Sequence, residues 1–153
     1  MSETIEAVNE NNLSELLPLM RQYQQFYQIV DICDERNRNF FAQFGLANPF
    51  GCQFLYCQDR EVLGFATVYF TYTSTIAAKV AVMNDLFTLE NARGKGIGRK
   101  LIEHCRQYAK DRGAARLQWI TGEDNTAAQS LYDNLDTASR NWKFYTYPVI
   151  QDN

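Results

Sequence analysis

A glycine-rich turn between an apolar strand and an amphipathic helix constrains the fold of this chain more than any other feature. Residues 80–89 are almost continuously apolar, as in a strand that is covered on both faces. The turn after them reads Asn91-Ala92-Arg93-Gly94-Lys95-Gly96-Ile97-Gly98. We predict a helix over Gly98–Arg112, ended by Gly113, and then a strand over Arg116–Thr121. This order predicts a parallel strand pair joined by a right-handed crossover, and therefore a mixed α/β fold.

The turn has the composition of an anion-binding site. Unpaired backbone N–H groups and the positive end of the following helix point toward the same place. Arg93, Lys95, Arg99 and Lys100 lie where the helix dipole disfavours cations, which favours a bound polyanion over a turn whose basic residues are only solvated. No GxxxxGK[ST] nucleotide loop is present, and the third glycine position of a GxGxxG dinucleotide pattern is occupied by Arg99.

Three short motifs, in order along the chain, carry a resemblance to a known family. The first is Asp85-Leu86-Phe87-Thr88, the second is Arg93-Gly94-Lys95-Gly96-Ile97-Gly98, and the third pairs Asn125 with Tyr132. They resemble the fourth strand, the [RQ]xxGx[GA] pyrophosphate loop and the Asn…Tyr helix of the GCN5-related N-acetyltransferase (GNAT) superfamily. The resemblance spans nearly the whole chain and implies a single domain over residues 1–153. It implies a central, mostly antiparallel mixed sheet with a splayed parallel pair and helices on both faces.

By this resemblance the ligand is acetyl-coenzyme A, used as a co-substrate without a metal. The loop residues that would hold its pyrophosphate are Arg93, Gly94, Lys95, Gly96, Ile97, Gly98 and Arg99. The pantetheine arm would run beside Leu86, Phe87 and Thr88, with Asn125 as a further cofactor-binding residue. Main-chain pairing with the arm requires that this strand splay from Arg116–Thr121.

The implied reaction is direct transfer of an acetyl group from sulfur to an amine. The resemblance makes Tyr132 the partner of the leaving thiolate, whereas without the motif it would be read as a packed aromatic. Asn84 and Asp85 are polar interruptions of an apolar strand, and strand alternation predicts that they face opposite sides. Asn84 is an amide and cannot act as a base, so either a water chain removes the proton, with Asn84 orienting a water, or another carboxylate reaches in. Asp85 is the candidate proton acceptor, with a structural hydrogen-bonding role as the alternative.

The acceptor pocket is predicted from the first two helices and their loop. Tyr27, Asp31 and Asp34 combine an aromatic ring with carboxylates, which suits a cationic amine. Tyr72 is a further candidate, and the alternative is a core-facing helix followed by a solvated acidic loop. We expect a small-molecule primary amine such as a polyamine, an amino acid or an aminoglycoside. A protein lysine or N-terminal acetyltransferase and a non-catalytic acyl-CoA sensor are the alternatives.

Composition limits the other function classes. The chain of 153 residues has a net charge of -3 and a pI near 5.2, which argues against a general nucleic-acid binder. It has no membrane-length apolar run and no secretory leader pattern, so we expect a cytoplasmic protein without a membrane partner. One His and four Cys without a CxxC pair predict free thiols and no zinc site. A homodimer is possible by the resemblance.

The remaining elements follow from periodicity and turn residues. Asn12 is expected to cap a helix, with Glu15 as its capping-box partner. A second helix is expected to stop at Gly45. The other expected elements are a strand over Thr4–Val8, the helix over Asp34–Phe44, strands over Gln53–Cys57 and Val62–Tyr72 around a 58–61 turn, a helix over Asn125–Leu135 and a last strand over Trp142–Tyr147.

Overall fold

The computed structural model describes residues 2–150 of the chain and divides into two compact units. The first unit runs up to Ile120 and contains the sheet and three α-helices. The second begins at Thr121 and contains one helix.

A five-stranded mixed sheet forms the centre of the first unit, with the strands in the order β1-β2-β3-β4-β5. Neighbouring strands from β1 to β4 are antiparallel, and β4 and β5 are parallel. The expected mostly antiparallel sheet with one parallel pair is thus confirmed. The strands are β1 (Glu3–Ala7), β2 (Gly51–Gln58), β3 (Glu61–Thr73), β4 (Ala78–Thr88) and β5 (Leu117–Gln118).

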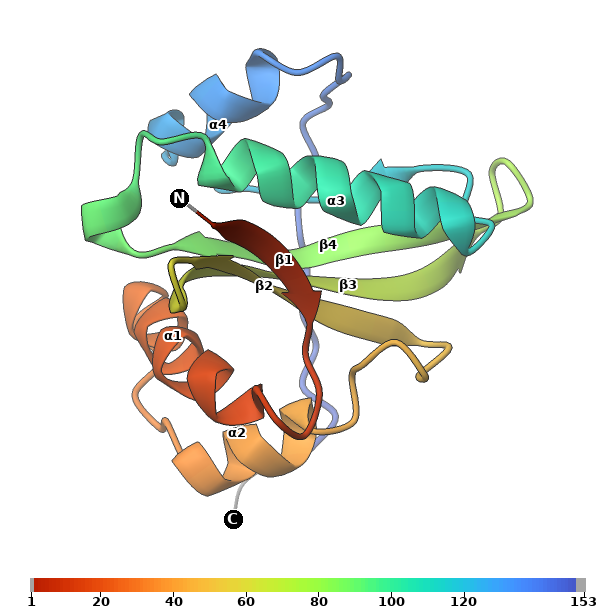
Figure 1. Cartoon of the computed structure of the whole chain (residues 1–153). Coiled ribbons are helices and arrows are strands. Elements are labelled where there is room, and N and C mark those ends of the chain that lie inside the picture. Colours follow the sequence, from red (N-terminus) through yellow and green to blue (C-terminus); the bar gives the residue numbers. More distant parts are fainter. Residues whose placement is uncertain (1, 151–153) are drawn as a thin grey trace. The chain divides into compact units, whose positions relative to one another are not determined.

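Helices of the first unit lie on both faces of this sheet (Figure 1). They are α1 (Leu13–Phe26), α2 (Asp34–Phe41) and α3 (Ile97–Asp111), and a short 3-10 turn, η1 (Glu90–Ala92), precedes α3. On one face, the apolar side of α1 packs with Phe41 of α2 against the cross-strand row Leu55–Phe65–Phe87. On the other face, Phe54 of β2 makes an edge contact with Tyr108 of α3, at 5.0 Å between ring centroids. The predicted apolar arc of this helix is buried: Leu101, Ile102, Cys105, Tyr108 and Ala109.

Local sequence signals explain the ends of several elements. Asp59 and Arg60 both have positive φ, which gives the two-residue turn that fits a twisted β2–β3 hairpin. Gly113 has a φ of +81° and lies just beyond α3, as its predicted role as a helix stop requires. α2 ends at Phe41 rather than Phe44, and beyond its end the Phe44 carbonyl accepts a hydrogen bond from the Gln53 N–H of β2.

The predicted capping box at Asn12 is wrong, although Asn12 stands at the N-cap position of α1. Its Oδ1 accepts a hydrogen bond from the Asn9 N–H at 2.7 Å, and its Nδ2 donates to the Ala7 carbonyl at 3.1 Å. Since the side chain bonds backward into the turn after β1, it makes no hydrogen bond to the first turn of the helix. Asn12 therefore stabilises the connection from strand to helix.

The second unit contains α4 (Thr126–Asp133), which ends two residues before the predicted Leu135. The predicted last strand over Trp142–Tyr147 is wrong, since these residues belong to no strand in the structure described. Trp142, Phe144, Tyr145 and Tyr147 are each about four-fifths exposed or more. Aromatic residues favour strands mainly through packing against paired neighbours, so their β propensity alone does not form one.

Candidate active site

The glycine-rich turn takes the left-handed backbone that its glycines allow. Gly94 and Gly96 have φ of +79° and +82°, a region that residues with a side chain rarely adopt. A Cβ at either position would meet no atom within 4 Å, so backbone conformation rather than crowding explains these glycines. Gly96 is the N-cap of α3 and no side chain caps the helix. The first N–H groups of α3 are therefore available for an anion.

Charges around the turn divide into paired and unpaired ones. Lys100 is bound by Glu3 of β1 at 2.7 Å, so it does not add to the anion site as the sequence suggested. Arg93, Lys95 and Arg99 are exposed and form no ion pair within residues 2–150. Arg93 Nε donates to the Thr88 carbonyl at 3.1 Å, and this hydrogen bond holds the Arg93 side chain beside the end of β4.

β4 is paired with β5 over a very short length. The ladder joins only Ala81 to Leu117 and Val82 to Gln118, and β4 continues for six more residues to Thr88. Over that length β4 pairs with β3 on one side only. The β5-facing edge of Leu86, Phe87 and Thr88 thus has no strand partner within residues 2–150, as expected for the splayed geometry that the resemblance requires.

A β-bulge lies at the point where β4 separates from β5. Val68 is opposite Met83, but the next residue of β3, Thr67, is opposite Asp85, so Asn84 is the extra residue. The prediction from strand alternation that Asn84 and Asp85 face apart does not hold here. Asn84 Nδ2 donates to Asp85 Oδ1 at 3.0 Å.

Asp85 is a buried carboxylate in a set of hydrogen-bonding side chains. It is 7% exposed, and burial raises its pKa above the usual range of an aspartate. Hydrogen bonds from Thr67, Tyr23 and Asn84 act in the opposite direction by stabilising the charged form. No ion pair joins Asp85 to a Lys, Arg or His in the described part of the chain. A carboxyl group with these properties can accept a proton near neutral pH more readily than an exposed one.

Tyrosines surround this carboxylate on the α1 side of the sheet. Tyr23 of α1 packs edge-on against Phe65 and Phe87, with ring centroids 5.6 and 6.0 Å away. Burial, followed by the charge of Asp85, raises the pKa of Tyr23. Burial and Asp85 likewise raise the pKa of Tyr69 on β3. Both tyrosines are therefore neutral hydrogen-bonding groups at physiological pH.

The predicted acceptor residues lie in different environments. Tyr27 follows α1, is half-exposed and makes an edge contact with Tyr23 at 5.0 Å, so it adjoins the Asp85 group. Asp31 and Asp34 are exposed and already paired, with Arg36 at 3.4 Å and with Arg21 at 3.0 Å respectively. These pairs weaken the argument that the acidic loop attracts a cation.

Tyr72 lies toward the opposite end of the β3–β4 hairpin and is mostly exposed. It is opposite Lys79, five residues before Asn84, and this corresponds to about 17 Å along the strand. The structure therefore does not bring Tyr72 to the Asp85 group.

Asn125 and Tyr132 belong to the second unit, where they lie on or at the start of α4. Asn125 is the N-cap, and its Oδ1 accepts a hydrogen bond from the Ala128 N–H at 3.3 Å. Tyr132 is partly buried, and its carbonyl accepts a hydrogen bond from the Thr137 hydroxyl at 2.9 Å. The roles of both residues toward acetyl-CoA stay predictions.

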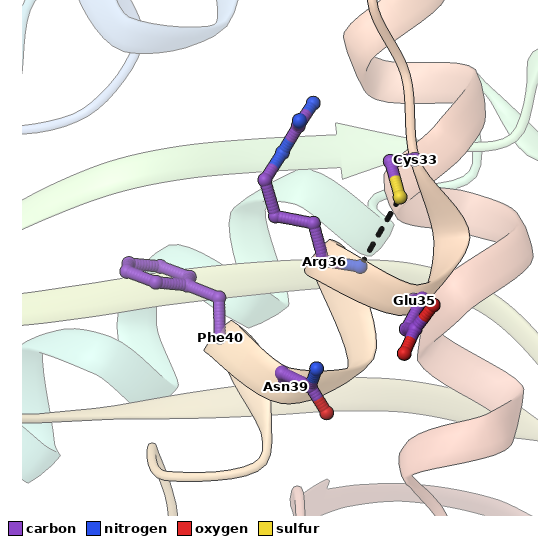
Figure 2. A pocket seen from close by; sticks show the side chains of 5 residues that line it. All are labelled: Cys33, Glu35, Arg36, Asn39 and Phe40. Atoms are coloured by element: carbon purple, nitrogen blue, oxygen red, sulfur yellow. Dashed lines mark hydrogen bonds between the residues drawn. The ribbon is translucent and has the colours of Figure 1, made fainter.

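A separate hollow opens over α2. It is lined by Cys33, Glu35, Arg36, Asn39 and Phe40, and Cys33 Sγ accepts a hydrogen bond from the Arg36 N–H (Figure 2). None of the residues predicted for acetyl-CoA binding or proton transfer lines it. The hollow is therefore separate from the residues predicted for acetyl-CoA binding and proton transfer.

Gln53, Thr67 and Tyr69 join the Asp85 group without having been predicted. Gln53 and Thr67 are fully buried polar residues in otherwise apolar strands. The same signal, a polar interruption of an apolar run, drew attention to Asn84 and Asp85. Applied to β2 and β3, it would have found both residues.

Comparison with known proteins adds to this geometry. A family model described as "Acetyltransferase (GNAT) family" matches residues 16–136. The chain belongs to the GNAT family. It is accordingly an N-acetyltransferase, and GNAT acetyltransferases use acetyl-CoA as the donor.

Two GNAT relatives and one structure illustrate the similarity. The chain is 30% identical over 129 residues to an uncharacterized N-acetyltransferase, YhfO, of Bacillus subtilis, covering 84% of this chain and 85% of the relative. It is 34% identical over 119 residues to the D-amino-acid N-acetyltransferase HPA3 of Saccharomyces cerevisiae, covering 76% and 73%. The structure of an aminoglycoside N-acetyltransferase in complex with CoA has a TM-score of 0.80 at 17% identity, covering 97% and 96%. This last likeness shows the GNAT fold.

Within residues 2–150, no group of three or more His, Cys, Asp or Glu is arranged to hold a metal ion. No helix in this part of the chain has both the length and the apolar character to cross a membrane.

Proposed function

We propose that this N-acetyltransferase moves an acetyl group from acetyl-CoA directly to the primary amine of a small molecule in a ternary complex, with Asp85 accepting the amine's proton. The observation that carries the proposal is the buried Asp85 carboxylate, held by neutral donors where β4 leaves β5. A base is needed there because a primary amine is protonated near neutral pH.

The residues of the first unit fit acetyl-CoA. The uncapped start of α3 and the exposed Arg93, Lys95 and Arg99 suit the pyrophosphate, and Arg93 is anchored beside the end of β4. The open edge of Leu86, Phe87 and Thr88 suits the pantetheine amides, which would pair with it as an added strand. Gly94, Gly96, Ile97 and Gly98 would contribute main-chain contacts. Asn125, in the second unit, is proposed as a further cofactor-binding residue.

Acetyl-CoA supplies the acetyl group as a thioester, so transfer forms a C–N bond, breaks the C–S bond and releases a thiol. Asp85 takes the proton from the ammonium nitrogen, and an N–H bond is exchanged for an O–H bond. Asn84 donates a 3.0 Å hydrogen bond to one Asp85 oxygen and so orients the carboxylate. Asn84 would also orient a water. Tyr132 would supply the proton that the leaving sulfur needs, as the resemblance implies, and the second proton that the nitrogen loses as the amide forms would replace it on Tyr132.

The acceptor is proposed to be a small molecule. The relatives include an enzyme named for D-amino acids, and a GNAT-fold structure is named for aminoglycosides. Tyr27 adjoins the Asp85 group through Tyr23 and would contact the acceptor. Asp31 and Asp34 would contribute only if the acceptor displaced their arginine partners.

We further propose that residues 1–153 act as one domain, because the family match runs through Ile120 into the second unit. Cytoplasmic location and homodimer formation stay predictions from the sequence.

The test is a thiol-release assay with acetyl-CoA across amino acids of both configurations, polyamines, aminoglycosides and lysine peptides. The proposal expects at least one small amine to raise turnover well above the rate of acetyl-CoA hydrolysis. Turnover with peptides alone would overturn the small-molecule proposal. Tight CoA binding without turnover for any amine would overturn the catalytic one.

A further inference from the structure

A row of three polar side chains crosses three adjacent strands on the α1 side of the sheet. Gln53 of β2 is opposite Thr67 of β3, and Thr67 is opposite Asp85 of β4. Gln53 and Thr67 are 0% exposed and Asp85 is 7% exposed. The neighbouring row in the same sheet, Leu55–Phe65–Phe87, belongs to the apolar core. The polar row therefore lies within an otherwise apolar layer.

Hydrogen bonds along the row run in one direction. Gln53 Nε2 donates to Thr67 Oγ1 at 3.1 Å, and the Thr67 hydroxyl bonds to the Asp85 carboxylate. An amide nitrogen only donates, so the Thr67 oxygen accepts from Gln53 and its single hydrogen is left for Asp85. The Asp85 carboxylate thus accepts a hydrogen bond from the Thr67 hydroxyl, and Gln53, two strands away from Asp85, sets the direction of that hydroxyl.

This arrangement leaves one polar atom without a partner. Gln53 Oε1 is buried and has no hydrogen-bond partner among the described residues. A buried unsatisfied acceptor destabilises a fold, and an apolar side chain at position 53 would avoid that cost. Turning the amide over would give Oε1 the Thr67 hydroxyl as its donor, but it would leave the buried Nε2 without its Thr67 partner and would take that hydroxyl from Asp85. One amide atom is therefore unsatisfied in either orientation, and only the observed orientation leaves the Thr67 hydrogen for Asp85.

We propose that Thr67 and Gln53 are positioning residues that hold the Asp85 carboxylate, charged and in one orientation, for proton acceptance from the amine. The inference rests on the proposed function, because it takes Asp85 as the proton acceptor. Thr67 acts on Asp85 directly, and Gln53 acts through Thr67. Neither residue contacts the reacting atoms.

The other groups that face Asp85 are also known from the structure. Tyr23 of α1 donates to it, Asn84 of β4 donates to it, and Tyr69 of β3 lies close enough for its ionisation to be opposed by the Asp85 charge. The two tyrosines are neutral at physiological pH, as their raised pKa values require. No cation is paired with Asp85 across residues 2–150, so neutral donors alone hold its charge.

The experiment measures the Asp85 titration directly. Carboxyl ¹³C NMR of the unliganded protein gives the titration midpoint of Asp85, and kcat/KM against pH with the best amine gives the acid limb of activity. The variants are Thr67→Val, which keeps the shape and removes the hydroxyl, Thr67→Ser, which restores it, and Gln53→Leu. Val68→Ala is the matched control, because Val68 is equally buried on β3 but points to the opposite face.

In Thr67→Val, the Asp85 midpoint and the acid limb should both move up by about one to two pH units, the worth of one hydrogen bond to a charged group. At pH values below the acid limb, kcat/KM of Thr67→Val should be roughly 10- to 100-fold lower than that of the wild type, and it should recover at high pH. Thr67→Ser should titrate as the wild type does, and Gln53→Leu should give a smaller upward shift. Val68→Ala should destabilise the protein without moving the midpoint.

An unmoved Asp85 midpoint in folded Thr67→Val would overturn the inference. If Thr67→Val does not fold, Gln53→Leu decides, and an unmoved midpoint in that variant has the same meaning. The proposed function fails differently, since it is overturned if Asp85→Asn retains activity and its acid limb, whatever Thr67 does to the titration.

Discussion

Replacing Asp85 by Asn tests the proposed base with little disturbance of its surroundings. The carboxamide has the same shape, and its oxygen can still accept from Asn84 Nδ2. Its NH₂ group can donate to the hydroxyl oxygens of Thr67 and Tyr23, since these groups rotate. The variant should therefore fold, so a loss of activity would reflect the lost base.

The expected loss in kcat/KM is about 10²- to 10⁴-fold, the usual contribution of a positioned base, or roughly 3–5 kcal/mol of transition-state stabilisation. The wild type should show an acid limb above the usual range of a carboxylate, because burial raises the pKa of Asp85. In Asp85→Asn this limb should be absent. Asp111→Asn, an exposed change at the end of α3, is the control and should keep both rate and limb.

Stability should change in the opposite direction from activity. The pKa of Asp85 is raised in the folded state, so its contribution to stability is present below the unfolded pKa and is lost as pH rises through the folded value. Each unit of that increase costs the wild type about 1.4 kcal/mol at neutral pH. Asp85→Asn removes this cost, so urea denaturation should show less loss of stability as the pH rises above the usual range of an aspartate.

The base assignment would be refuted if Asp85→Asn kept its activity within about threefold of the wild type and retained the acid limb.

Three further changes test the donor site and the thiolate partner. Lys95→Glu should weaken CoA binding by about tenfold or more in calorimetry. The control is Lys110→Glu, an exposed change at the other end of α3 that should leave CoA binding unchanged. If both variants weaken CoA binding equally, the anion-site argument is contradicted. Tyr132→Phe should lower turnover by about 10²-fold or more with little change in CoA affinity, and an unchanged rate would remove Tyr132 from the mechanism. Gly96→Ala should destabilise the protein by about 1–2 kcal/mol in urea denaturation, because φ of +82° strains a residue with a Cβ; no change would mean that the turn relaxes.

Features that depend on local sequence were predictable. The strand, turn and helix from β4 to α3 follow from apolar runs, glycines that require positive φ and an amphipathic arc, all of which lie within a few residues of one another. Elements that depend on a neighbouring strand for pairing were harder to predict. β5 has only two paired residues, and the aromatic segment over residues 142–147, with equally good β propensity, belongs to no strand.

Candidate site residues could be named from the sequence where one motif contains them. Asp85 and the loop from Arg93 to Arg99 were predicted in this way, and the structure adds that their charges form no ion pair within residues 2–150. Gln53 and Thr67 lie 32 and 18 residues before Asp85, and only strand register brings them together. The capping of Asn12 failed for a related reason, because its side chain bonds to the preceding turn, and residue spacing does not distinguish the two directions.

The bulge at Asn84 is what gives Asp85 this environment. On the Met83 side of the bulge, Val68 is opposite Met83; continuing that register would place Asn84 opposite Thr67 and Asp85 opposite Ala66. Ala66 shares its row with Phe54, whose ring contacts α3, so the carboxylate would then enter the apolar layer beneath that helix. Because side chains alternate with a period of two, the single extra residue moves Asp85 to the α1 face, opposite Thr67 and beside Tyr23. Asn84 thus contributes through its backbone as the inserted residue, independently of the amide that makes it unsuitable as a base.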